Sequence, residues 1–441
     1  MKSQKNILFG IMAFGLGIRL LVAILTTSWV FPSDGHFWQY GYEMGQVAAS
    51  LALGNGFSWP EWSNYPHGPT SWMAPAYPLI MAGVFKVFGI YSMHSAMALE
   101  FLLSLASVLT CILVYVLGKH LYNAQTGLIG AFLLAIYPPA IFYSVRSLWD
   151  TSIFTCCLLL VVLLFLKLAD APTLKRGSGL GLILGVTALI NPIIICTYPF
   201  ALAWLYLKAD GNRILVLKTI GLMLTAFCLA ISPWLVRNYL TFGQFTFIKS
   251  NFGNELYVGI KQYLGRDNGD ESSSQDIGSV SFRKFNRTVL EESNEVTRNG
   301  FLLRQAMMFI AEHPLRFAQQ VMRRFARYWT FMRPYPGWQA TISLTIYLTV
   351  LLLALAGIIL SKAKGRDVQL VLLFLLSLPF PYYLTVAHIF RYRFPVEPIL
   401  LIFAAYTLYR IVMCLAFSSR LHGFTNPYVR VLGKPLTNFE K

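Results

Sequence analysis

Long apolar runs, separated by short polar segments, dominate this chain. Runs near or above the roughly 20 residues that cross a bilayer recur about ten times. We place them at 7–30, 96–118, 126–143, 151–169, 178–193, 195–209, 214–236, 338–360, 367–387 and 394–417. This pattern predicts an all-α polytopic membrane protein with about ten transmembrane helices.

Composition excludes a soluble globule. Hydrophobic residues make up 56% of the 441 positions and charged residues only 12%, too few to cover a solvated surface. All six cysteines fall inside the apolar runs, where a free thiol behaves as a small apolar group. The sequence therefore favours neither a disulfide framework nor a zinc site.

The distribution of Lys and Arg predicts the orientation, because basic residues near the ends of spans stay on the cytoplasmic side. With the N-terminus inside, the shorter outer segments hold only Lys86, Arg146, Arg391 and Arg393. Both termini are then cytoplasmic, and the expected location is the bacterial inner (plasma) membrane. Much of the net charge of +17 reflects this topology, so no nucleic-acid partner is needed.

The spans divide the chain into segments of different character. The long outer loop contains a polar, turn-rich stretch at 265–278, expected to be mobile, and an amphipathic helix at 291–329 that breaks near His313. We expect a signal-anchor first span at 1–30, an outer loop with juxtamembrane helices at 31–95, spans two to seven at 96–236, the large outer loop at 237–337, spans eight to ten at 338–417, and a basic cytoplasmic tail at 418–441.

Ionisable residues gather on the predicted outer side. Each has an ordinary alternative: a loop carboxylate can simply be solvated, an Arg can anchor at the interface, and Arg146 with Asp150 can form a structural ion pair. The candidates for chemistry are Asp34, Glu43, His67, Arg146, Asp150, Arg237, Lys249, His388, Arg391 and Arg393.

Four stretches, at 42–57, 68–78, 233–239 and 391–398, carry a family resemblance. In this order and topology the chain resembles the polytopic GT-C glycosyltransferases. It is similar to the protein O-mannosyltransferases and lipid A aminoarabinose transferases, and closest to their bacterial relatives of unassigned acceptor. The resemblance implies inverting transfer of a hexosyl or pentosyl group from a polyprenyl-phosphate donor to a lipid, glycan or protein acceptor at the outer membrane face, in assembly of the cell envelope.

Site roles follow from the resemblance. A carboxylate of the first loop would be the general base, with Glu43 first and Asp34 second. Relatives carry an adjacent Asp-Glu pair there, whereas here eight residues separate the two acids. Cations would stabilise the departing phosphate, and the remaining candidates would position substrate. The binding candidates are Arg237, Lys249, Arg391, Arg393, Asp150, Arg146, His67 and His388.

The sequence also bears on cofactor use and on other functions. The first loop lacks the Asp-x-Asp pattern that a divalent cation would bridge to phosphate, so we expect no cofactor and no metal. A secondary transporter remains an alternative, because Asn191 and Pro192 are typical of a broken helix beside a substrate site. A flippase or ligase for lipid-linked saccharides would share the outer charges.

Overall fold

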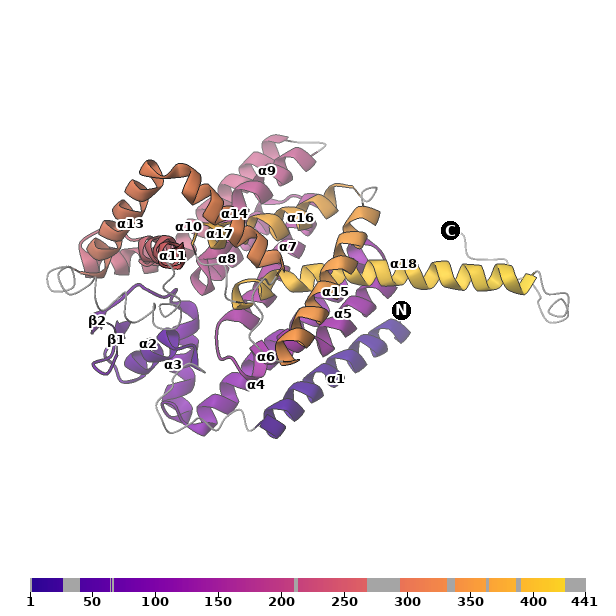
Figure 1. Ribbon diagram of the computed structural model, residues 1–441, viewed down its shortest axis with the longest axis horizontal. Helices are drawn as coiled ribbons and strands as arrows, with labels where there is room; N and C mark the ends of the chain where they lie inside the picture. Colours follow the sequence, from indigo (N-terminus) through magenta and orange to yellow (C-terminus); the bar gives the residue numbers. More distant parts are fainter. Residues whose placement is uncertain are drawn as a thin grey trace.

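The computed structural model is helical throughout nearly all of the part of the chain it describes (Figure 1). A short antiparallel pair, β1 (Ser58–Trp59) and β2 (Gly68–Pro69), is the exception among the described residues. The described residues are 2–26, 40–63, 65, 67–209, 213–267, 294–330, 338–361, 365–385 and 390–424.

Seven helices in the described ranges are long and apolar enough to cross a membrane. They occupy the expected runs, and the predicted all-α polytopic class is confirmed. These spans are formed by α1 (Lys2–Thr26), α4 (Met93–Leu121), α7 (Thr151–Asp170), α10 (Arg213–Phe242), α15 (Trp338–Leu360), α16 (Arg366–Ser377) with α17 (Phe380–Leu384), and η5 (Phe394–Val396) with α18 (Glu397–Phe424).

The other three expected runs form shorter or bent helices. The run at 126–143 is a pair, α5 (Ala124–Ile136) and α6 (Pro138–Val145), bent by 52°, because a proline cannot donate the hydrogen bond that would continue α5. The remaining two runs correspond to α8 (Leu174–Ile190) and to η2 (Pro192–Thr197) with α9 (Tyr198–Lys208). With the bent pair counted as one, the described chain holds up to eight long spans.

Small residues allow α8 and α10 to pack closely. Gly177, Gly181 and Gly185 recur every four residues and therefore share one face of α8. A side chain at Gly181 would collide with the backbone oxygen of Met223 on α10. Small residues at such spacing are typical of close helix contacts in membranes.

The connecting segments build a cap on one end of the helical bundle. In Figure 1 these elements gather on the left, away from the N-terminus of α1. We use the name cap for α2 (Glu43–Ala52), α3 (Ala76–Phe88), β1, β2, α11 (Phe252–Asp267), α13 (Glu295–Glu312) and α14 (Pro314–Thr330).

Two stretches of the cap are helical as the sequence analysis expected. The break between α13 and α14 falls at His313, since Pro314 starts a new helix more readily than it continues one. Helix α3 fills the run expected to lie beside the membrane. Helix α11 was not expected.

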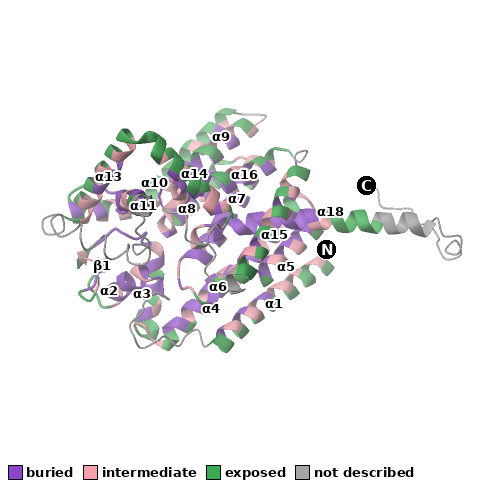
Figure 2. Cartoon of the chain, in the orientation of Figure 1, coloured by how far each residue is buried: buried purple, intermediate pink, exposed green. Residues whose placement is uncertain are grey.

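Buried residues occur both in the cap and in the spans (Figure 2). Most of α2 is buried in a core with α3, where Val47 and Tyr77 are inaccessible. The outer surface of the bundle leaves large apolar side chains exposed, such as Leu352 on α15 and Leu415 on α18. A continuous apolar exterior of this kind fits a lipid surrounding.

Candidate active site

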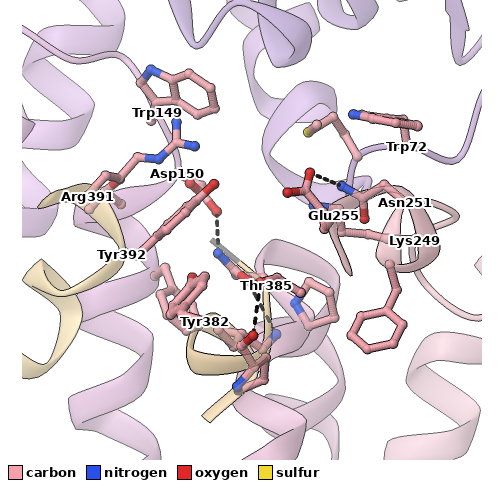
Figure 3. Close-up of a pocket in the computed structure, with 18 of the residues that line it drawn as sticks. Trp72, Trp149, Asp150, Lys249, Asn251, Glu255, Tyr382, Thr385, Arg391 and Tyr392 are labelled. Atoms are coloured by element: carbon pink, nitrogen blue, oxygen red, sulfur yellow. Dashed lines mark hydrogen bonds between the residues drawn. The ribbon is translucent and has the colours of Figure 1, made fainter. Parts of the chain in front are cut away.

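Five acidic or basic side chains from distant parts of the chain line one cavity of about 460 Å³ between the cap and the bundle. Figure 3 shows Arg391 and Asp150 on one side of it and Glu255 and Lys249 on the other. The five are Glu43 at the start of α2, Asp150 just before α7, Lys249 between α10 and α11, Glu255 in the first turn of α11, and Arg391 in η4 (Phe390–Tyr392).

A strained turn places Glu43. Gly41 has a φ of +69° and Tyr42 a φ of +38°, a region that non-glycine residues rarely adopt. A Cβ on Gly41 would lie 3.1 Å from the backbone oxygen of Leu148. The turn is therefore pressed against the segment that carries Asp150, which brings the two carboxylates to the same cavity. Strain of this kind often marks a functional site.

The carboxyl group of Glu43 binds a proton more tightly than a solvated glutamate. The Tyr65 hydroxyl donates a hydrogen bond to its Oε1 over 3.2 Å. Enclosure by protein raises the pKa of Glu43, although Arg391, Lys249 and the Tyr65 hydrogen bond act against that rise. A carboxylate with a raised pKa is a stronger base than its solvated counterpart.

Asp150 is almost fully buried at the edge of the cavity, with 4% of its surface exposed. Asn191 donates to its Oδ2 over 3.1 Å, and the same Asn191 accepts from the backbone of Ile193 at the start of η2. Burial raises the pKa of Asp150, while Arg391 and Lys249 oppose this. The helix break at Asn191 thus supports a carboxylate of the cavity.

Two cations face these acids. The guanidinium of Arg391 lies 3.2 Å from the centroid of the Trp149 ring, an arrangement that holds it by cation–π attraction. Burial lowers the pKa of Lys249, and Glu255, Asp150 and Glu43 oppose that fall. The cavity therefore holds positive groups suited to an anion such as a phosphate.

The sequence does not single out Glu255, which falls in the expected large outer loop at 237–337. Asn251 donates to Glu255 Oε1 over 3.5 Å, and burial raises the pKa of Glu255 against the influence of Lys249. The available signal was Asn251 followed by an acid in the first turn, a pattern typical of a helix start.

The structure places three other candidates outside this cavity. Arg237 donates to the backbone oxygens of Thr70 and Phe57, each over 2.7 Å, so it fastens the first loop to α10. Arg393 is buried and pairs with Glu397, Nε to Oε1 at 2.7 Å. Arg146 is exposed and caps the end of α6. These three arginines therefore do not line this cavity, and a role for them in substrate binding stays a prediction.

The remaining candidates lie elsewhere. His67 lines a second, smaller cavity next to the first. Asp34 and His388 lie outside the described residues. Within the described ranges, no three His, Cys, Asp or Glu side chains converge as a metal site would need, and metal independence stays a prediction.

Comparison with known proteins fits this architecture. Residues 72–236 match the family model described as dolichyl-phosphate-mannose-protein mannosyltransferase. The chain superposes on the archaeal oligosaccharyltransferase AglB from Archaeoglobus fulgidus, solved with an inhibitory peptide and a dolichol-phosphate, with a TM-score of 0.58 and 14% identity over 98% of this chain and 52% of that one. This chain shares the fold of the part of AglB that it covers.

An oligosaccharyltransferase of Archaeoglobus fulgidus in its apo form gives a TM-score of 0.58 and 15% identity over 96% of this chain and 52% of that one. The chain thus spans about half the length of these structures. ArnT from Cupriavidus metallidurans, solved with undecaprenyl phosphate, gives a TM-score of 0.44 and 13% identity. The match covers 96% of this chain and 66% of ArnT. No curated protein sequence matches the chain.

Proposed function

We propose that this protein is an inverting glycosyltransferase that moves a sugar from a polyprenyl-phosphate donor to an acceptor. The observation that carries the proposal is the single cavity in which an enclosed carboxylate of raised pKa, Glu43, faces two cations, Lys249 and Arg391. The fold shared with part of AglB and the match at 72–236 support the same reaction class.

In the proposed step, Glu43 takes the proton of an acceptor hydroxyl. The hydroxyl oxygen forms a bond to the anomeric carbon while the bond from that carbon to the phosphate oxygen breaks. The electron pair of the broken bond stays on the polyprenyl phosphate. Attack from the face opposite the phosphate inverts the anomeric centre. A positioned base typically contributes about 100- to 10,000-fold to such a rate.

Lys249 and Arg391 would bind the phosphate and stabilise the charge that builds on its bridging oxygen. Arg391 is pre-positioned by its stacking on Trp149, so it loses little freedom on binding the anion. Asp150 and Glu255 compensate the positive charges of these two cations inside the enclosed site. We assign these two acids a positioning role.

Apolar side chains of the same cavity support a lipid-linked donor. Phe154, Ile193, Ile195, Phe247 and Phe252 line it alongside the charged groups. A polyprenyl chain needs apolar surface next to the site that holds its phosphate. A cavity for a free sugar nucleotide would gain nothing from such a lining.

We place the reaction at the outer face of the bacterial inner membrane, with both termini in the cytoplasm. The biased distribution of Lys and Arg supports this orientation. So does the arrangement of the cap, which lies at the end of the molecule away from the N-terminus of α1 (Figure 1).

The test is donor turnover by the purified protein in liposomes. A panel of polyprenyl phosphates carrying radiolabelled hexoses or pentoses is supplied, and release of polyprenyl phosphate is measured with and without EDTA. We expect at least one donor to be consumed, and consumption to continue with EDTA. If no donor of the panel is consumed while a solute crosses the bilayer, the transporter alternative replaces this proposal.

A further inference from the structure

A second cavity of about 270 Å³ lies behind the wall of the first. Trp72 lines both cavities. Tyr65 lines the second cavity, and its hydroxyl reaches through to Glu43 of the first. One aromatic side chain therefore separates the second cavity from the candidate base.

The second cavity combines aromatic rings with polar groups. Trp59 and Tyr65 are stacked, with centroids 4.2 Å apart and planes inclined by 15°, and Trp72, Phe242 and Leu302 add apolar surface. Three amides, a carboxylate, a guanidinium and an imidazole also line the cavity: Asn254, Asn294, Asn299, Glu295, Arg298 and His67.

Glu295 holds the two walls of this cavity together. It sits in the first turn of α13 and accepts from the Ser71 backbone over 2.9 Å and from Trp59 Nε1 over 3.4 Å. Ser250 also donates to it. The pair β1 and β2 is thereby fixed against α13, so the cavity has walls from two rigid elements and its shape is set before any ligand arrives.

We propose that the second cavity binds the acceptor and that this acceptor is a saccharide. The inference rests on the proposed function and names its second substrate class. Amides, a guanidinium and an imidazole match the donors and acceptors of clustered hydroxyl groups, and ring faces match the apolar face of a sugar. A lipid acceptor would need an unbroken apolar lining, whereas polar and charged side chains interrupt the apolar surface of the second cavity.

The geometry gives the acceptor a short path to the base. An acceptor hydroxyl can replace the Tyr65 hydroxyl at Glu43 Oε1. That hydroxyl then lies in the first cavity while the rest of the saccharide stays in the second. It then loses its proton to Glu43 and bonds to the anomeric carbon as the phosphate leaves. Tyr65 is thus a positioning residue at the junction of the two cavities.

Arrayed ligands test the acceptor class without knowledge of the sugar. The full-length protein in detergent is applied to printed saccharides and to printed peptides containing Ser, Thr and Asn. We expect binding to one or more saccharides, weakened about tenfold or more by Arg298→Ala through loss of charged hydrogen bonds. His67→Ala, at an exposed position, should also weaken binding. Arg304→Ala is the matched control, since Arg304 is exposed on the same helix.

Each outcome decides the proposal. Saccharide binding that falls in Arg298→Ala and His67→Ala but not in Arg304→Ala supports it. Binding to peptides alone, to no printed ligand, or to saccharides with equal strength in all variants overturns it. Thermal unfolding of each variant shows whether a loss comes from misfolding. Donor turnover by the wild type is measured separately. Consumption of donor without saccharide binding would refute this inference but not the proposed function.

Discussion

At the residue scale, the cavity depends on one carboxylate at the start of a helix. Glu43→Gln keeps the shape of the side chain and removes the base. We expect transfer to fall by about 100-fold or more, while donor binding persists because Lys249 and Arg391 are intact. Turnover and equilibrium binding of labelled donor measure the two effects. Glu61→Gln, an exposed acid of the same loop, is the control. Retained activity in Glu43→Gln would transfer the role to Asp34 or another acid.

The pH dependence of the reaction reports on the same group. The pKa of Glu43 is raised by its enclosure, so the rate should fall as pH drops through that raised pKa and the base becomes protonated. The Tyr65 hydrogen bond stabilises the charged form. Tyr65→Phe should therefore raise this pKa further and move the acidic limb of the rate profile to higher pH. Tyr239→Phe, exposed on α10, should leave the limb in place. An acidic limb unmoved by Tyr65→Phe contradicts the assignment.

Substitution of two arginines that are two residues apart should affect different properties, donor affinity in one case and stability in the other. Arg391 lines the cavity, so Arg391→Ala should weaken donor binding with little change in thermal stability. Arg393 neutralises the buried Glu397. Its removal should lower the free energy of unfolding by about 3–5 kcal/mol, because a buried charge loses its partner. Donor titration and thermal unfolding of both variants distinguish the two roles. If both variants lost donor affinity equally and kept equal thermal stability, Arg393 would instead belong to the donor-binding site.

At the element scale, close packing of α8 on α10 depends on glycines that face α10. Gly181→Ala would place a methyl group against the backbone oxygen of Met223, so the helices must separate and stability should fall. Gly179 on the same helix has no atom within 4 Å of such a methyl group. Gly179→Ala should therefore be neutral or stabilise by about 0.5–1 kcal/mol. Thermal unfolding in one detergent compares the two. Equal effects would mean that the contact between α8 and α10 is looser than described.

The cap shows how far local sequence determines an element. Helices α13 and α14 could be expected from apolar periodicity and from Pro314, both of which are local signals. Helix α11 could not be placed with the same ease, because its 16 residues include polar and glycine positions and its buried side chains, Leu256 and Ile260, pack against α13 across a long gap in sequence.

At the scale of the whole molecule, the proposed topology puts the cap outside the cell. A cysteine at Glu312, exposed at the end of α13, should react with a membrane-impermeant maleimide in intact cells. A cysteine at Lys175, exposed at the start of α8, should react only after permeabilisation. A background with the native cysteines replaced by serine or alanine removes other labelling. Labelling of both sites from the same side would refute the proposed orientation.

The sequence by itself determined the membrane class, the positions of the apolar runs, and the carboxylate that opens α2, because run length, composition and helix-start signals act over a few neighbouring residues. Only the tertiary structure decided which charged groups share a cavity. Arg391 lines the same cavity as Glu43 and Asp150, whereas Arg393 pairs with Glu397 and Arg237 hydrogen-bonds to the first loop. Contacts between segments far apart in the chain determine the positions of Glu255 and Glu295. Such long-range contacts depend on how the helices pack against one another, and a local sequence pattern does not predict them.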